Sequence, residues 1–431
     1  MLHGFYVCYI LLPACNMLQN YKVFFYLWYL FSSGFMNIRF FIFALFFSII
    51  LPQQTKAQSK NFFDYNEGLS NSLINAIHQD RKGFIWVATE DGLNRFDGIS
   101  FKSFFASPND ANSLKNNFVT ALAEDNYGNL WVGQINGLQV YHPESESFTE
   151  IPLFIPDERI HLFISSIIVA SNNDIWMTTS GYGLIRFNHE TGQIDYSETI
   201  NKQLCSMNLR IVFEDSNGVL WIGSDNEGLN TYDPLSGEIN LFSAFAEKGN
   251  ALPSNSISSI CEDDHGNIYV GSLKGGLVQI QKSTGKIKHI AAEQQQEREM
   301  PVKSLLFDSK KRLWIGTDGF GLKRMSPATG LMENFSPNTS PFDFSKSKIH
   351  AIIEDNGGNI WASIFQKGLY LFPETPVIFR HYGYHAFGEK SIGSSCVTSI
   401  IGIDNHIWVG TDGDGIYQIN RENQINPKNP S

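Results

Sequence analysis

The sequence has 431 residues, more than one ordinary domain requires, and contains 36 Gly, 13% aromatic and 17% charged residues. This composition suits short strands joined by tight turns and argues against an all-helical chain. Beyond residue 57 there are 29 basic and 43 acidic residues, a net charge of −14. That charge disfavours nucleic acid and anionic membrane surfaces as partners.

The first 57 residues form a leader without Asp or Glu. Within residues 36–57, Arg39 precedes an uncharged run over Phe40–Leu51, and small residues lead up to Ala57. This order is typical of a signal peptide, and we predict cleavage after Ala57. Residues 1–35 do not fit the scheme. We interpret them as a wrongly assigned upstream extension, with an additional membrane helix as the alternative.

The rest of the sequence repeats one unit. Each copy places an aromatic anchor after a polar turn, and consecutive anchors lie 45–48 residues apart. This period matches a four-stranded blade of a β-propeller and is longer than helical or leucine-rich repeats need. We interpret the anchors as structural repeat positions; they are Trp86, Trp131, Trp176, Trp221, Tyr269, Trp314, Trp361 and Trp408.

The second copy illustrates the expected blade. Its alternating and apolar runs predict strands at residues 119–123, 130–133, 137–141 and 147–151. Between the first two strands, Asp125 can accept hydrogen bonds from turn amides and Gly128 can take a positive φ. The third copy lacks this turn pattern, and the sixth has Lys311 in place of the glycine, so we expect looser turns there.

The conspicuous residues of the repeat have structural explanations. An aromatic that returns in every copy is expected to pack between neighbouring blades and not to form a ligand platform. Glu-Asp pairs occur at 124–125, 214–215, 262–263 and 354–355. Neighbours on a strand point to opposite faces, so a pair cannot converge on one substrate atom, and the calcium-loop pattern is missing. We therefore assign no catalytic, cofactor-binding or metal-binding residue, and the ligand-binding residues stay unknown.

The copies predict an all-β fold, a seven-bladed β-propeller of four-stranded antiparallel blades over residues 58–375. The fragment Phe62–Tyr65 has the phase of a fourth strand and could complete the seventh blade, which would remove an exposed edge. The eighth copy, 376–420, would then be the first blade of a truncated second propeller, and 421–431 a disordered tail. A single eight-bladed ring is the alternative.

Cysteine and histidine offer little chemistry. Cys205, Cys261 and Cys396 are scattered without a CxxC pair, and we expect each to be a small apolar side chain in a strand. Of the histidines, His381 and His385 have metal-ligand spacing, but an ordinary strand or loop position is the favoured interpretation.

The unit Glu-Asp-x-x-Gly-x-Leu-Trp-Val-Gly, followed by Gly-Leu-x-x-Tyr, resembles the two-component regulator propeller repeat of periplasmic sensor regions in hybrid histidine kinases. The resemblance covers residues 60–420. It implies two tandem seven-bladed propellers followed by a β-sandwich, a membrane helix, a kinase, a receiver and a DNA-binding domain. We expect this chain to be an N-terminal fragment of such a protein and carry over no catalytic residue.

The leading hypothesis is a periplasmic sensor that binds a glycan-derived ligand or a partner domain and relays this event to a histidine kinase absent from the chain. We expect no enzymatic activity of the chain itself and no cofactor. The expected partners are an oligosaccharide and, through the full-length protein, a second copy; nucleic acid is not expected. Membrane contact would come only from a downstream segment or an uncleaved leader. The alternatives are a secreted propeller enzyme of the lyase or glycosidase type and a stand-alone scaffold. Specificity is expected in the irregular loops at 155–161 and 291–300.

Overall fold

The computed structural model describes residues 61–154, 159–160, 162–246, 250–290, 299–336, 344–374, 396–404, 406–420 and 425–428. The predicted extension 1–35, the predicted signal peptide 36–57 and the His381/His385 pair lie outside these residues. Most of the two irregular loops lies outside them as well. The chain divides into two compact units, of which one spans Ser59–Ile378.

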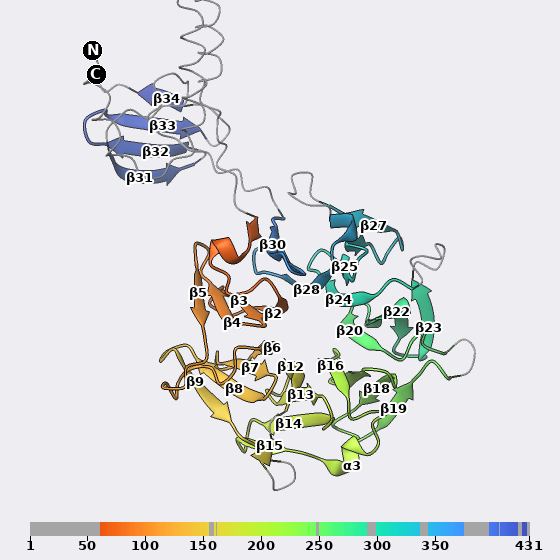
Figure 1. The fold of residues 1–431 in the computed structure, drawn as a ribbon. Coiled ribbons are helices and arrows are strands. Elements are labelled where there is room, and N and C mark those ends of the chain that lie inside the picture. Colours follow the sequence, from red (N-terminus) through yellow and green to blue (C-terminus); the bar gives the residue numbers. More distant parts are fainter. Residues whose placement is uncertain are drawn as a thin grey trace, which may run out of the picture. The chain divides into compact units, whose positions relative to one another are not determined.

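The larger unit is a ring of seven four-stranded antiparallel sheets (Figure 1), as the sequence predicts. The strands of the first three blades are β2 (Ile74–Gln79), β3 (Ile85–Thr89), β4 (Gly92–Phe96) and β5 (Phe101–Phe104); β6 (Val119–Glu124), β7 (Leu130–Gln134), β8 (Gly137–His142) and β9 (Ser147–Ile151); and β12 (Ile164–Val169), β13 (Ile175–Thr179), β14 (Leu184–Asn188) and β15 (Gln193–Asp195).

The next three blades follow the same order. Their strands are β16 (Leu209–Glu214), β17 (Leu220–Ser224), β18 (Leu229–Tyr232) and β19 (Ile239–Phe242); β20 (Ile257–Glu262), β21 (Asn267–Ser272), β22 (Gly276–Gln281) and β23 (Lys286–Ile290); and β24 (Val302–Phe307), β25 (Leu313–Thr317), β26 (Leu322–Met325) and β27 (Met332–Phe335). Short connecting elements are β10 (Leu153–Phe154), β11 (Arg159–Ile160), η1 (Tyr65–Glu67), α3 (Glu198–Asn201) and η2 (Phe344–Lys346).

The seventh blade is shared between the two ends of the ring. It contains β28 (Ile349–Glu354), β29 (Ile360–Ile364), β30 (Gly368–Phe372) and β1 (Phe62–Phe63), and β1 is its outermost strand. Phe62 pairs with Tyr370 and Phe63 with Leu369. β28 also packs beside β2, so the ring closes after seven blades. This confirms the predicted closing strand and rules out a single eight-bladed ring.

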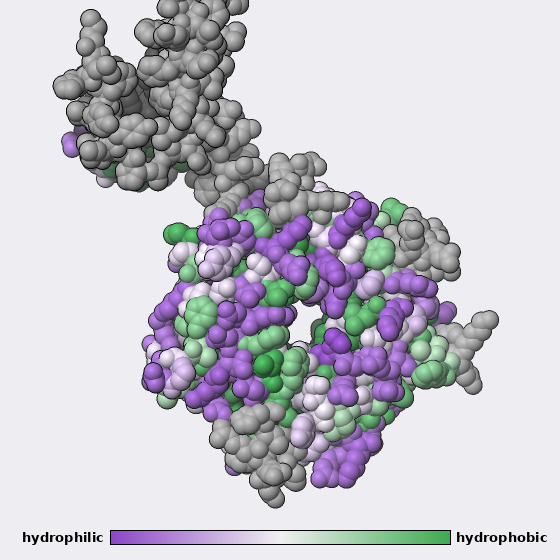
Figure 2. Space-filling model, viewed as in Figure 1, coloured by the Kyte–Doolittle hydropathy of each residue, from purple (hydrophilic) through white to green (hydrophobic). Residues whose placement is uncertain are grey.

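The first strand of each blade lies innermost and surrounds a central channel. These inner strands are β2, β6, β12, β16, β20, β24 and β28, and each packs against the next (Figure 1). The space-filling view shows the ring open at its centre (Figure 2). Side chains on the inner strands are therefore placed to line the channel.

The eighth sheet belongs to the other unit and is described by itself. It consists of β31 (Val397–Ile403), β32 (His406–Thr411), β33 (Ile416–Asn420) and β34 (Ile425–Lys428), in that order. The prediction of a disordered tail over 421–431 is wrong for Ile425–Lys428, because these residues form β34 and pair with β33. A polar segment with Pro427 is compatible with an edge strand, whose outer backbone groups need no partner. Assignment of this sheet to a second propeller stays a prediction.

The core of the ring lies between neighbouring sheets. Trp86 of the first blade packs on Tyr141 of the second, with ring centroids 4.9 Å apart, and it is only 1% exposed. Trp361 of the seventh blade packs on Phe63 and on Phe96 of the first blade. The packing of an anchor on the following blade therefore continues across the ring closure. The anchors Trp131, Trp176, Trp221, Tyr269 and Trp314 are buried in clusters with the following blade. Trp408 in the eighth sheet is only partly buried.

Candidate functional site

The acidic turn residue supports both the turn and the anchor. Asp125 accepts hydrogen bonds at Oδ1 from the backbone N–H groups of Tyr127 and Asn129, each at 2.9 Å. Its Oδ2 accepts a hydrogen bond from the indole Nε1 of Trp131 at 3.1 Å. The same indole bond forms in four other blades, at Asp80, Asp215, Asp308 and Asp355. The Asp-to-Trp spacing of the repeat is thus explained by structure, because a buried indole N–H requires an acceptor.

The glutamate before this aspartate ties two blades together, a role that sequence reasoning missed. Glu262 accepts hydrogen bonds from the backbone N–H and the hydroxyl of Ser216 in the preceding blade, both at 2.7 Å. Glu124, Glu214 and Glu354 make the equivalent contact. Across the ring closure, Gln79 takes the place of the glutamate and accepts from the N–H of Asn356 at 2.6 Å. Each of these glutamates is thus engaged in a contact between neighbouring blades.

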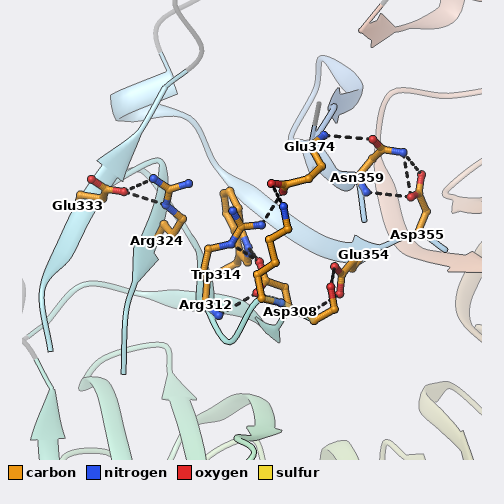
Figure 3. A network of polar contacts seen from close by, with 11 residues as sticks. Asp308, Arg312, Trp314, Arg324, Glu333, Glu354, Asp355, Asn359 and Glu374 are labelled. Carbon is orange, nitrogen blue, oxygen red and sulfur yellow. Dashed lines mark hydrogen bonds and ion pairs between the residues drawn. The ribbon is translucent and has the colours of Figure 1, made fainter. Parts of the chain in front are cut away.

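Figure 3 shows this bonding between the sixth and seventh blades. Asp308 accepts from the indole of Trp314 at 2.7 Å and pairs with Arg312 at 2.6 Å. Arg312 also reaches Glu374 in the seventh blade at 2.8 Å. Lys310 pairs with the same carboxylate, and the pKa of Glu374 is lowered chiefly by that contact.

The expectation of looser turns in the third and sixth blades is wrong. The turn N–H of Asn173 donates to Ala170 at 2.8 Å and that of Lys311 to Asp308 at 2.9 Å, compared with 3.0 Å for Gly128 and Asp125. Asn173 and Lys311 take the positive φ themselves, at 66° and 62°. Non-glycine residues can adopt this conformation at a modest energetic cost, so the turn keeps its shape.

The cysteine expectation holds for one residue of three. Cys261 is buried on β20, and burial raises the pKa of its thiol. Cys205 is partly exposed in the connection between α3 and β16, and Cys396 is exposed just before β31, so neither is a buried strand residue. Within the described ranges, no three His, Cys, Asp or Glu side chains are grouped so as to hold a metal ion.

Every inner strand of the ring carries a β-bulge near its start, where the pairing with the second strand shifts. In four blades the second residue of the strand is short and polar, and it donates a side-chain hydrogen bond to a carbonyl of the next inner strand. These residues are Asn75, Thr120, Ser165 and Ser258. Bulges commonly redirect side chains beside functional sites, and here the position is used for joining blades.

In the other three blades the bulge carries Arg210 on β16, Lys303 on β24 and His350 on β28. These residues have no matching bond to the next inner strand among the described contacts. Each precedes the anchor of its blade by 11 residues, as the four short polar residues do. An alignment of the copies at that offset would have revealed them. We take this group at one end of the channel as the candidate functional site.

His350 is neutral near pH 7 in this setting. Its ring packs on Phe365 at 5.0 Å, and burial, together with the positive charges of Lys303 and Lys348, lowers its pKa to about 4, against an opposing effect of Asp318. His78, the other described histidine on an inner strand of the ring, also has a lowered pKa, chiefly because of burial.

The lowered pKa of His350 predicts acid sensitivity. Between pH 6.5 and about 4 the unfolded chain binds a proton at this position that the folded chain does not, so stability falls as pH decreases through that range. When the pH is lowered from 7 to 4.5, the unfolding free energy of the wild type should fall by about 1 kcal/mol more than that of His350→Gln. This value allows for solvent screening of a partly exposed ring. Urea denaturation at the two pH values measures this difference, and His265→Gln, at an exposed side chain, is the control. Identical losses in both variants would contradict the prediction.

The comparisons with known proteins agree with the repeat. The two-component regulator propeller family matches residues 68–91, 113–136, 203–226, 251–274 and 296–319. Each segment contains an inner strand, its acidic turn and the anchor strand. Histidine kinase P4 of Formosa agariphila is 40% identical over 77 residues, which make up 17% of this chain and 6% of that protein.

Two groups of solved structures share the fold. The extracellular domain of a putative hybrid two-component system from B. thetaiotaomicron superposes with a TM-score of 0.63 at 23% identity, covering 86% of this chain and 49% of that one. A catalytically inactive virginiamycin B lyase from Staphylococcus aureus, solved with quinupristin, gives a TM-score of 0.54 at 16% identity, covering 73% and 97%. At these identities the likeness concerns the fold alone.

The chain thus spans 6% of the length of the curated relative and about half of the extracellular domain that it resembles. In the part of the chain that the structure describes, no helix is long and apolar enough for a membrane span. The five matched segments fall in the first, second, fourth, fifth and sixth blades of the ring, at the same place in each blade. The chain contains two-component regulator propeller repeats.

Proposed function

We propose that the chain is the extracytoplasmic sensor propeller of a hybrid two-component signalling protein, which binds a glycan-derived ligand or a partner domain and passes the event to a histidine kinase. The match of five blades to the two-component regulator propeller carries this proposal. The 77-residue similarity to a histidine kinase supports it.

The geometry supports binding because the repeated carboxylates and aromatics are engaged in architecture. The aspartates hold the turns and the indoles, the glutamates join blades, and the anchors fill the space between sheets. What remains for recognition is the set of positions at which blades differ, above all Arg210, Lys303 and His350. Recognition by positions that depart from a repeat is the usual arrangement in repeat architectures.

A propeller enzyme of the lyase or glycosidase type is the second candidate, favoured by the shared fold of virginiamycin B lyase. Such an enzyme would need a general base at the channel, for which His78 and His350 are the histidines on inner strands of the described ring.

Thermal-shift screening of the purified chain against an oligosaccharide library tests the proposal, together with product analysis of the same mixtures. We expect a saccharide to raise the melting temperature without being consumed, since a ligand stabilises the folded state that binds it. Steady turnover that disappears in His78→Ala or His350→Ala would establish the enzyme instead. A library with neither stabilisation nor turnover would count against glycan sensing.

A further inference from the structure

The channel end where the inner strands begin gathers positive charge in an otherwise acidic protein. Arg210, Lys303 and His350 occupy the bulges of β16, β24 and β28, and Lys348 directly precedes β28. The strands β16, β20, β24 and β28 follow one another around the channel. Over this arc the short polar residues that join other blades are replaced by the cations Arg210 and Lys303 and by the neutral His350, and only the bulge at Ser258 keeps a short polar residue.

Two nearby carboxylates form ion pairs with two of the three cations, and the third cation, Lys303, has no such pair within the described ranges. Arg210 pairs with Asp225, and Lys348 pairs with Asp318 at 2.8 Å. Lys303 is half-buried and makes no hydrogen bond or ion pair within the described ranges. Burial lowers its pKa, and Arg210 and Lys348 add to that effect while Asp318 opposes it. The half-buried Lys303 ammonium thus lies near two other cations and the Asp318 carboxylate, which already pairs with Lys348, so an incoming anion would balance the remaining positive charge.

Two buried nitrogens near Lys303 also lack partners. Nε of Arg210 and Nε2 of His350 are buried and have no hydrogen-bond partner among the described residues. A buried polar atom without a partner costs free energy, and such atoms gather where a ligand completes the bonding. The two nitrogens come from β16 and β28, the first and last strands of the arc that contains Lys303. Arg210, Lys303 and His350 therefore bring potential donors from three blades to this end of the channel.

We propose that Arg210, Lys303 and His350 form a binding site for a small ligand that carries a carboxylate, with Lys303 as its ion-pair partner. This inference rests on the proposed sensor function and names the class of its ligand, a saccharide bearing a hexuronic acid. One unpaired cation matches the single charge of a carboxylate. Asp225 and Asp318 disfavour the second charge of a phosphate monoester.

Calorimetric titration of the purified chain with D-glucuronate and D-glucose tests the site, because the two sugars differ by the carboxylate. We expect glucuronate to bind, glucose to bind at least tenfold more weakly, and the glucuronate affinity to fall as NaCl increases. Lys303→Gln should weaken glucuronate binding about tenfold or more, the usual effect of losing a charged hydrogen-bond partner. Lys288→Gln, the same change on the exposed face of the outer strand β23, is the matched control and should bind as the wild type does.

Arg210→Gln provides a second variant with the same expected direction, and circular dichroism confirms that both variants fold. Equal glucuronate binding by the wild type and Lys303→Gln would overturn the inference, as would an affinity independent of salt. A neutral oligosaccharide that stabilises the wild type and Lys303→Gln alike, without glucuronate binding, would overturn the carboxylate site and leave the sensor function standing. Failure of every saccharide, charged or neutral, would contradict both.

Discussion

Gly368→Ala should open the ring and lower the unfolding free energy by about 3–5 kcal/mol, the range for loss of a buried phenylalanine. Gly368 has a φ of +122°, and a Cβ there would lie 2.3 Å from the carbonyl oxygen of Phe63. The contact is with backbone, so β1 must leave β30 to make room. Phe63 would then lose its packing on Phe96 and Trp361, at 4.9 and 5.8 Å.

Gly98→Ala is the matched control for this substitution. Gly98 also has a positive φ, +96°, but nothing lies within 4 Å of its would-be Cβ. The Gly98→Ala substitution should therefore lower the unfolding free energy only by the backbone strain of an alanine at positive φ, about 1–2 kcal/mol. Urea denaturation gives both values, and hydrogen exchange at Phe63 reports whether β1 has detached. A freed edge on β30 should also promote association at high protein concentration. Similar costs for the two variants would show that closure by β1 adds little.

The repeat period was enough to predict the ring because each blade is one supersecondary unit with its own turn and anchor. The strands of the second blade appear within a residue of their expected ends, and the fragment around Phe62 closes the seventh blade as its phase indicates. In such a fold, the place of a residue within its repeat determines which strand of the blade it occupies.

Contacts between copies were harder to foresee. The bond from Ser216 to Glu262 spans 46 residues, and nothing within one copy indicates that a glutamate reaches back to the preceding turn. The bulges depend on the pairing of two strands, which a strand pattern of period two does not contain. Within its own copy, Lys303 thus looks like an ordinary polar strand residue. Its offset of 11 residues from the anchor aligns it with Arg210 and His350, and the shared bulge places all three at one end of the channel.

Trp86→Ala should lower the unfolding free energy of the ring by about 3–5 kcal/mol, because it empties the space between the first and second blades. Trp86 is 1% exposed and packs on Tyr141 and Phe104, with centroids 4.9 and 5.7 Å away. Its indole also donates to Asp80 at 2.8 Å, and that carboxylate oxygen would be left buried without its donor.

Two further variants separate the causes in a calorimetric melt. Trp86→Phe keeps most of the packing and removes the bond to Asp80, so it should cost only about 1–2 kcal/mol. Trp408→Ala changes the same repeat position in the other unit, where the side chain is only partly buried, and should leave the melting of the ring unchanged. If Trp86→Phe were as destabilising as Trp86→Ala, the hydrogen bond and not the packing between blades would be the main contribution of this residue. If neither destabilised the ring, the anchor would have no architectural role, and its recurrence in every copy would require a functional explanation.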